Sequence, residues 1–169
     1  MSHESHRAEA AASVRCHVVT ISDTRTLETD ASGRAIADLL REAGHDVLGR
    51  VVVKDDRAAI RAILVETLGR DDTQAVITTG GTGISSRDNT FEVVNGLLEK
   101  RLDGFGELFR MLSYQEIGSS AMLSRACAGT ARGKLLAALP GSEAAVRLAM
   151  TKLLLPELGH LVGELSRQP

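Results

Sequence analysis

The chain has 169 residues, of which 43% are hydrophobic and 25% are charged, and its formal net charge is −2. This length and composition are typical of one soluble globular domain with a sizeable core. A slightly acidic chain without clustered Lys and Arg is not expected to bind nucleic acid, because contacts to phosphates need concentrated positive charge. No apolar run approaches the ~20 residues that span a membrane.

The N-terminal stretch MSHESHRAEAAAS lacks the hydrophobic segment of a signal peptide. Residues 1–12 show no periodic apolar face, so we expect a disordered tail, followed by a single domain over residues 13–169. Cys16 and Cys127 lack the spacing of a metal site, and we expect both to be small buried residues in a reducing compartment. The predicted location is therefore the cytoplasm.

The first half of the chain predicts strands that alternate with helices. Apolar, β-branched runs predict the strands, and apolar residues at helical spacing predict the helices. Asp30 or Ser32 can cap the first helix. The predicted strands cover residues 14–22, 46–53 and 74–79, and the predicted helices cover residues 31–43 and 57–68. Strands that alternate with helices, without hairpin signals, predict a parallel sheet with helices on both faces.

The second half of the chain predicts more helix and one hairpin. Helices are expected over residues 91–100 and from Gly104 onward, and two short runs around Arg132-Gly133 predict a hairpin at one edge of the sheet. Ser142 can cap a helix that reaches Leu154, and a last helix follows Pro156 over residues 157–165. The predicted fold is therefore a three-layer α/β/α domain with a mostly parallel sheet and an antiparallel edge hairpin.

The most informative stretch follows the third predicted strand. Thr79 leads into Gly80-Gly81-Thr82-Gly83, and polar residues suited to capping a helix come next. A strand, a glycine turn and a helix start form a site for anions, because free N–H groups and the helix dipole favour negative charge. The loop lacks the lysine of a P-loop and the spacing of a dinucleotide-binding motif. A tight turn without a ligand is the open alternative.

Polar and acidic residues follow several predicted strands. In an open parallel sheet the carboxyl ends of the strands lie at one edge, where ligands bind. Carboxylates beside a phosphate site repel the ligand unless a cation lies between them, and Mg²⁺ is the ordinary solution. The pattern predicts a Mg²⁺-dependent enzyme that acts on a phosphorylated small molecule. The residues expected at this edge are Ser22, Asp23, Asp55, Asp56, residues 79–83, Pro140, Gly141 and Ser142.

Each acid also has a structural interpretation. Asp23, Asp30 and Asp88 can cap helices or form turns, and one of Asp55 and Asp56 is expected to be only a helix cap. Ser113 and Glu116 lie near a predicted helix end and can be ordinary surface residues.

Several motifs together resemble the molybdenum cofactor biosynthesis proteins of the MoaB/MogA type. They occur in the family's order from about residue 14 to the C-terminus, and the SYQEIG segment and the short chain favour the MoaB branch. The matching segments are VTISDTR (19–25), DASG (30–33), TTGGTG (78–83), RD (87–88), GFGE (104–107), SYQEIG (113–118), MLSR (122–125) and PGS (140–142).

The resemblance implies a molybdopterin-binding α/β fold that assembles as a homotrimer or homohexamer. It also implies molybdopterin adenylyltransferase activity, in which Mg²⁺ and ATP place AMP on the terminal phosphate of molybdopterin. The family's two catalytic, metal-binding aspartates match Asp55 and Asp88. Residues implied to bind the pterin or the nucleotide are Ser22, Asp23, Thr79, Gly80, Gly81, Thr82, Gly83, Ser113, Glu116, Pro140, Gly141 and Ser142.

A second function stays open at this point. A protein of the same pathway can hold a pterin, a nucleotide or other molybdenum cofactor biosynthesis proteins without turnover. Both acids are present here, which favours catalysis over binding alone.

Overall fold

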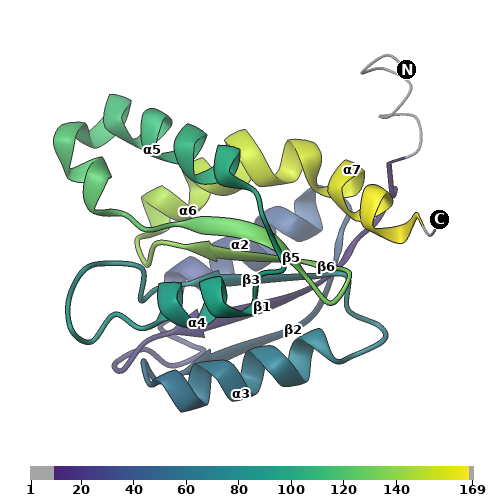
Figure 1. Ribbon diagram of the computed structural model, residues 1–169, viewed down its shortest axis with the longest axis horizontal. Helices are drawn as coiled ribbons and strands as arrows, with labels where there is room; N and C mark the ends of the chain where they lie inside the picture. The colour runs from purple at the N-terminus through teal and green to yellow at the C-terminus, as the bar shows by residue number, and fades with distance from the viewer. Residues whose placement is uncertain (1–9, 168–169) are drawn as a thin grey trace.

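A computed structural model describes residues 10–167 of the chain. It contains one six-stranded sheet in the order β2-β1-β3-β6-β5-β4 (Figure 1). Strands β2, β1, β3 and β6 are parallel, and β5 and β4 run antiparallel to their neighbours. The strands are β1 (Arg15–Ile21), β2 (Asp46–Val53), β3 (Ala75–Thr79), β4 (Lys100–Arg101), β5 (Cys127–Ala131) and β6 (Lys134–Leu139).

Helices cover both faces of this sheet (Figure 1). One buried cluster joins the sheet to α2, α5, α6 and α7, and a second joins it to α3 and α4. The helices are α2 (Ala31–Glu42), α3 (Arg57–Leu68), α4 (Thr90–Leu97), α5 (Asp103–Ile117), the 3₁₀ segment η1 (Gly118–Leu123), α6 (Glu143–Ala149), the π segment η2 (Met150–Leu154) and α7 (Leu155–Ser166). The predicted three-layer fold is confirmed.

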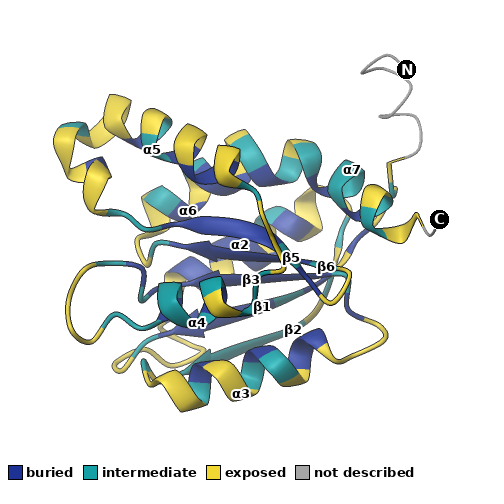
Figure 2. Cartoon of the chain, in the orientation of Figure 1, coloured by how far each residue is buried: buried dark blue, intermediate teal, exposed yellow. Residues whose placement is uncertain are grey.

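The core is aliphatic, as the scarcity of aromatic residues requires. Ile36, Leu64 and Leu136 are fully buried, and Phe109 is the one aromatic ring among the largest fully buried side chains of the described residues. Figure 2 shows the central strands as buried and much of α5 as exposed. Cys16 and Cys127 are buried free cysteines, as expected. Burial raises the pKa of the Cys16 thiol to about 12 and that of Cys127 to about 11, so both stay protonated.

The second half of the chain departs from the predicted boundaries. The predicted helix over residues 91–100 ends at Leu97, and Lys100–Arg101 instead form β4, which pairs with β5. The predicted hairpin is β5–β6, but β6 lies inside the sheet because it also pairs with β3. The spacing of apolar residues could not predict the pairing of β4 with β5, since β4 has only two residues.

The C-terminal helices are continuous, although a break was expected before Pro156. The π segment η2 connects α6 to α7, and Pro156 lies in the first turn of α7. The Leu155 N–H reaches back to the Met150 carbonyl. A wider turn of this kind accommodates a proline, which has no N–H and crowds the carbonyl four residues before it.

The start of the domain lies slightly before the predicted boundary. Residues 1–9 of the predicted tail are outside the described residues. The Ala11 N–H donates to the Gly159 carbonyl at 3.0 Å, and Ala11 packs against the main core cluster. The packed chain therefore includes Ala11, two residues before Ser13.

Candidate functional site

The carboxyl ends of β1, β3 and β6 surround a pocket with a volume of about 290 Å³. Parallel pairing brings these ends together at one edge, as predicted for an open sheet. Of the predicted site residues, those that line the pocket are Ser22, Asp55, Thr79, Gly80, Gly81, Asp88 and Gly141.

The glycine loop after β3 is tightly packed against its surroundings. Gly80 and Gly81 have φ angles of +97° and +69°, which residues with a side chain rarely adopt. A Cβ atom on Gly80 would collide with the Ile21 carbonyl. A Cβ atom on Gly81 would collide with Thr90 Oγ1 and lie 2.9 Å from Asp55 Oδ2. The two glycines are thus required by the fold of the loop itself, in addition to any approach of a ligand.

Asp55 and Asp88 each use one carboxylate oxygen to hold the loop. Asp55 Oδ1 accepts hydrogen bonds from the Asn89 backbone N–H at 3.1 Å and the Asn89 side-chain amide at 3.3 Å. Asp88 Oδ2 accepts from the Ser85 N–H at 2.8 Å. Within residues 10–167, Asp55 Oδ2 and Asp88 Oδ1 have no hydrogen-bond partner. Each acid that lines the pocket therefore has one carboxylate oxygen that is not used in hydrogen bonds among the described residues.

The electrostatics of the pocket disfavour an ionised Asp55. Burial raises the pKa of this carboxyl above its ordinary value, and the charges of Asp88 and Asp23 add to the effect. The hydrogen bonds from Asn89 act in the opposite direction. Clustered carboxylates of this kind are stabilised by a bound cation or by protonation.

Asp56, the neighbour of Asp55, has a structural role. Its side chain caps α3 by accepting from the Ala59 N–H at 2.9 Å. Asp56 is exposed and does not line the pocket. Of this acidic pair, Asp55 is the residue that faces the site.

Asp23 lies beside the pocket and supports its wall. One oxygen accepts from the Asp55 N–H at 3.2 Å, and the other pairs with the Arg87 guanidinium. These contacts hold the pKa of Asp23 below its ordinary value, with the hydrogen bond from Asp55 as the largest cause. Asp23 thus links the loop after β1 to the segment before α3 and to the segment that carries Arg87 and Asp88.

The turn after β6 is fastened to the other strand ends. The Pro140 carbonyl accepts from Thr79 Oγ1 at 2.7 Å, and the Gly141 carbonyl accepts from Ser32 Oγ at 2.6 Å. Ser142 caps α6 through a hydrogen bond from the Ala145 N–H. Gly141 lines the pocket, whereas Pro140 and Ser142 stabilise the turn around it.

Thr82 and Gly83 form the far side of the loop and contact Arg125. The Arg125 N–H donates to the Thr82 carbonyl at 3.1 Å, and the Arg125 guanidinium donates to the Gly83 carbonyl at 2.6 and 3.0 Å. The same guanidinium pairs with Glu92 in α4. Arg125 therefore holds both ends of the segment that carries Asp88.

Ser113 and Glu116 are not part of the pocket in a single chain. Both lie on α5, where Ser113 is buried and Glu116 is exposed. Neither lines any pocket around the glycine loop.

Three residues near the acids were not anticipated from the sequence. Arg25 lines the pocket and adds positive charge to it. Asn89 holds Asp55, and Arg57 donates to Asn89 Oδ1 at 3.1 Å. Asn89 and Arg57 lie 34 and 2 positions from Asp55, and no motif marks the contact between them. Sequence position gives no signal for a contact of this kind.

No group of three or more His, Cys, Asp or Glu side chains within residues 10–167 is placed to hold a metal ion alone. Two carboxylates suffice for Mg²⁺ when substrate phosphates and water complete its coordination. In the same part of the chain, no helix is long and apolar enough to cross a membrane.

The family model described as a probable molybdopterin binding domain matches residues 17–160, and the chain belongs to this family. Among curated proteins, molybdenum cofactor biosynthesis protein B of Bacillus anthracis is 55% identical over 169 residues, covering 99% of this chain and 100% of that protein. The protein of the same name from Bacillus subtilis is 48% identical, covering 99% of each chain.

Solved structures agree with this assignment. A crystal structure of a molybdenum cofactor biosynthesis protein B is 56% identical, has a TM-score of 0.91, and covers 94% of this chain and 99% of its own. The tungsten cofactor synthesizing protein MoaB of Pyrococcus furiosus is 32% identical with a TM-score of 0.84, covering 94% of this chain and 100% of its own. The predicted family is thereby confirmed.

Proposed function

We propose that the protein acts in molybdenum cofactor biosynthesis as a molybdopterin adenylyltransferase that uses Mg²⁺ and ATP. Membership of a molybdopterin-binding family supports a pterin substrate, and relatives named for this pathway support the pathway. One observation gives the main support for the adenylyl transfer. Asp55 and Asp88 line a single pocket beside the glycine loop, and each has one carboxylate oxygen without a hydrogen-bond partner among residues 10–167.

The two acids fit a magnesium ion in the proposed reaction. Hard carboxylate oxygens are preferred ligands of Mg²⁺. Burial, and to a lesser extent the charges of Asp88 and Asp23, raises the pKa of Asp55, and a bound cation would favour its ionised form. When bound, Mg²⁺ would neutralise charge on the phosphates. Asn89 and the Ser85 N–H would keep the two carboxylates oriented, so that little reorganisation accompanies the reaction.

The transfer itself is a substitution at phosphorus. An oxygen of the terminal phosphate of molybdopterin attacks the α-phosphorus of ATP and forms a new P–O bond. The bond from the α-phosphorus to the bridging oxygen breaks, and pyrophosphate leaves with the electron pair. The chain binds and orients the two substrates. Its glycine loop, Arg25 and Gly141 line the pocket that would receive the phosphate of the pterin.

The proposed assembly is a homotrimer or homohexamer. Along α5 and η1, apolar side chains are exposed in one chain, including Met111 (51%), Tyr114 (62%) and Met122 (77%). Exposed apolar side chains gathered on two consecutive segments support the proposal of an interaction surface here. It overlaps the segment from Gly104 to Gly118 that carries Ser113 and Glu116. Light scattering at micromolar concentration should show at least a trimer, and a monomer would contradict the proposed assembly.

The function is tested by incubating the protein with molybdopterin, Mg²⁺ and ATP and separating the products by chromatography. Adenylylated molybdopterin and pyrophosphate should form in equal amounts, and omission of Mg²⁺ or ATP should abolish both. If the protein binds molybdopterin but forms neither product, it is a pterin-binding protein without turnover.

A further inference from the structure

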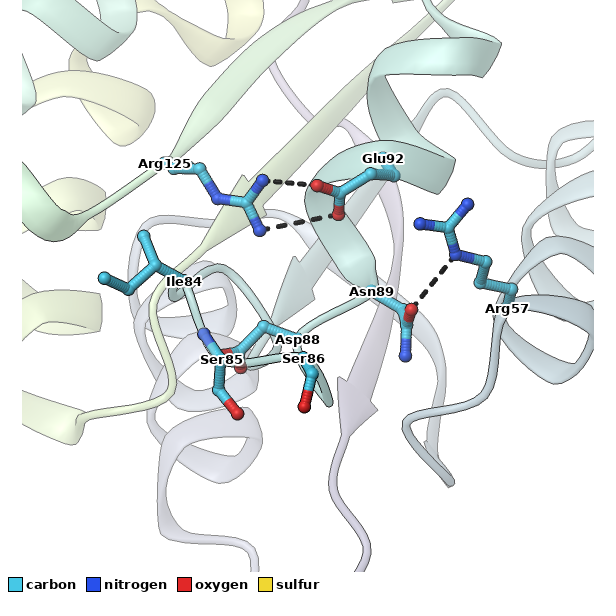
Figure 3. A pocket seen from close by; sticks show the side chains of 8 residues that line it. All are labelled: Arg57, Ile84, Ser85, Ser86, Asp88, Asn89, Glu92 and Arg125. Carbon is cyan, nitrogen blue, oxygen red and sulfur yellow. Dashed lines mark hydrogen bonds and ion pairs between the residues drawn. The ribbon is translucent and has the colours of Figure 1, made fainter.

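A second pocket lies directly beside the first, with a volume of about 250 Å³. Figure 3 shows its lining residues around the segment between the glycine loop and α4. Asp88 lines both pockets and is therefore part of the wall between them. The polar groups that line the outer pocket include Arg57, Ser85, Ser86 and Asn89.

Arg57 supplies a positive charge to this outer pocket and adds a small part to the lowered pKa of Glu92, which is set first by the hydrogen bond from Arg125. Its Nε donates to Asn89 Oδ1 at 3.1 Å. Within residues 10–167, its two terminal nitrogens have no hydrogen-bond or ion-pair partner, and Figure 3 shows them on the side away from Asn89. A guanidinium with free terminal nitrogens can bind a phosphate through two parallel hydrogen bonds.

The other charges of the outer pocket are already matched. Glu92 is bound by Arg125, whose hydrogen bond is the main cause that lowers the pKa of Glu92. Arg125 also donates to the Gly83 carbonyl, so its donors are committed to the loop. Asp88 is one of the acids to which we assign the cation. Arg57 is consequently the group of this pocket that remains for an anionic ligand.

The proposed reaction requires an anion site for the leaving pyrophosphate, separate from that of the pterin phosphate. In a substitution at phosphorus, the attacking oxygen and the leaving oxygen lie roughly in line on opposite sides of the phosphorus. The first pocket would hold the phosphate of the pterin on one side of the acids. The leaving group then needs space on the other side. At about 290 Å³, the first pocket is also small for two substrates.

We infer that the outer pocket binds the β- and γ-phosphates of ATP, which leave as pyrophosphate, and that Arg57 is their main contact. This inference rests on the proposed function, and it assigns the two pockets to the two substrates. Ser85 and Ser86 lie at the same pocket and can donate further hydrogen bonds.

The test uses inorganic pyrophosphate with Mg²⁺ as the probe, measured by calorimetry on the full chain. Arg57→Gln should weaken pyrophosphate binding by about 10-fold or more, the scale of one charge-assisted hydrogen bond. The KM for ATP should rise by a similar factor, whereas the KM for molybdopterin should stay within about 2-fold. Arg57→Lys keeps the charge but loses the paired donors, so it should fall between Arg57→Gln and the wild type.

Arg61→Gln is the matched control, since Arg61 is exposed one turn further along α3 and does not line the pocket. It should bind pyrophosphate like the wild type. Equal affinity in Arg57→Gln and the wild type, or no binding by the wild type, would overturn the inference. An equal rise in both KM values would also overturn it, because a disturbed loop affects both substrates. A wild type that binds pyrophosphate through Arg57 but forms no product would refute the adenylyltransferase and leave the anion site standing.

Discussion

Asp30 and Asp55 line the same pocket, yet the protein treats their carboxylates in opposite ways. Asp30 is 1% exposed and accepts hydrogen bonds from the Gly33 N–H at 2.9 Å, Thr20 Oγ1 at 2.7 Å and Arg50 at 3.0 Å. Asp55 receives hydrogen bonds from Asn89 on one oxygen only, and its charged neighbours Asp88 and Asp23 are of the same sign. Both carboxylate oxygens of Asp30 accept hydrogen bonds within the fold, whereas Asp55 has one oxygen without a donor among the described residues.

This difference shows how an acid that the fold uses fully can be distinguished from one that is a candidate for binding a ligand or a cation. An ionised carboxylate that is buried without enough donors is costly, so an incomplete carboxylate persists where a ligand or a cation completes it. Asp30 follows β1 and caps α2, so its position in the sequence is as suggestive as that of Asp55. The partners of the two oxygens distinguish the acids, and these partners are visible only in the structure.

The largest effect is expected on kcat, from substitutions of Asp55 and Asp88, the acids that each have an oxygen without a donor. Asp55→Asn and Asp88→Asn should each lower kcat for adenylylation by at least ~10²-fold, the scale of losing one electrostatic stabiliser. Pterin binding should survive, because the glycine loop remains. Asp56→Asn is the matched control, since Asn is as good a helix cap as Asp and Asp56 lies outside the pocket. Product formation is measured by chromatography. Normal turnover by both variants would refute the catalytic assignment of Asp55 and Asp88.

Asp30, whose two carboxylate oxygens both accept hydrogen bonds, should contribute to the stability of the fold. Asp30→Ala removes the cap of α2 and the carboxylate that accepts from Thr20 and Arg50, and Arg50 keeps only backbone carbonyl partners. We expect a loss of about 3 kcal/mol in the free energy of unfolding, at the lower end for a broken buried ion pair because Arg50 is partly exposed. Chemical denaturation should show this loss. Asp38→Ala, which removes an exposed acid of the same helix, should change stability by less than about 0.5 kcal/mol.

A smaller effect on stability is expected from the loop beside Asp55. Gly81→Ala places a Cβ against Thr90 and Asp55 and strains a residue with positive φ, which alone costs about 1–2 kcal/mol. The melting temperature should fall, and pterin binding should weaken as the loop shifts. Gly96→Ala in α4 meets no atom within 4 Å and serves as the control. A fully stable Gly81→Ala variant would show that the loop is looser than its contacts indicate.

The smallest effect concerns pH. The pKa of Asp55 is raised in the folded protein, mainly by burial, so its ionisation opposes folding at neutral pH. Asp55→Asn should therefore melt slightly above the wild type at neutral pH. The difference should shrink as the pH falls and vanish below the ordinary aspartate pKa of about 3.9, because the wild-type carboxyl is then protonated in both states. A variant that melts below the wild type at neutral pH would contradict this reading of Asp55.

Much of the fold could be predicted because local sequence patterns determine the longer helices and strands. The predicted bounds of β2 and α3 equal the observed ones. The apolar residues of each element are regularly spaced, and the residues that follow end it, as Gly69 does for α3. The two-residue strand β4 and the π segment η2 were not predictable, because pairing and helix geometry depend on residues far away or on crowding at Pro156. Local patterns thus sufficed for the long elements and failed for the short ones.

The candidate site could be predicted in outline only. Strand ends and glycines indicated the pocket, and the family resemblance selected Asp55 and Asp88. The contacts of Asn89, Arg57 and Arg125 could not be inferred, because each crosses more than 30 positions between separate elements. The distances of Ser113 and Glu116 from the pocket depend on the placement of α5, for which the sequence holds no local signal.

The contrast between Asp55 and Asp30 is tested most directly by metal binding. Mn²⁺, as a paramagnetic substitute for Mg²⁺, can be titrated in the presence of ATP and followed by electron paramagnetic resonance for the wild type, Asp55→Asn, Asp88→Asn and Asp30→Asn. We expect one Mn²⁺ per chain in the wild type and in folded Asp30→Asn, with at least about 10-fold weaker binding in the other two variants. Unchanged binding in Asp55→Asn and Asp88→Asn would contradict the account.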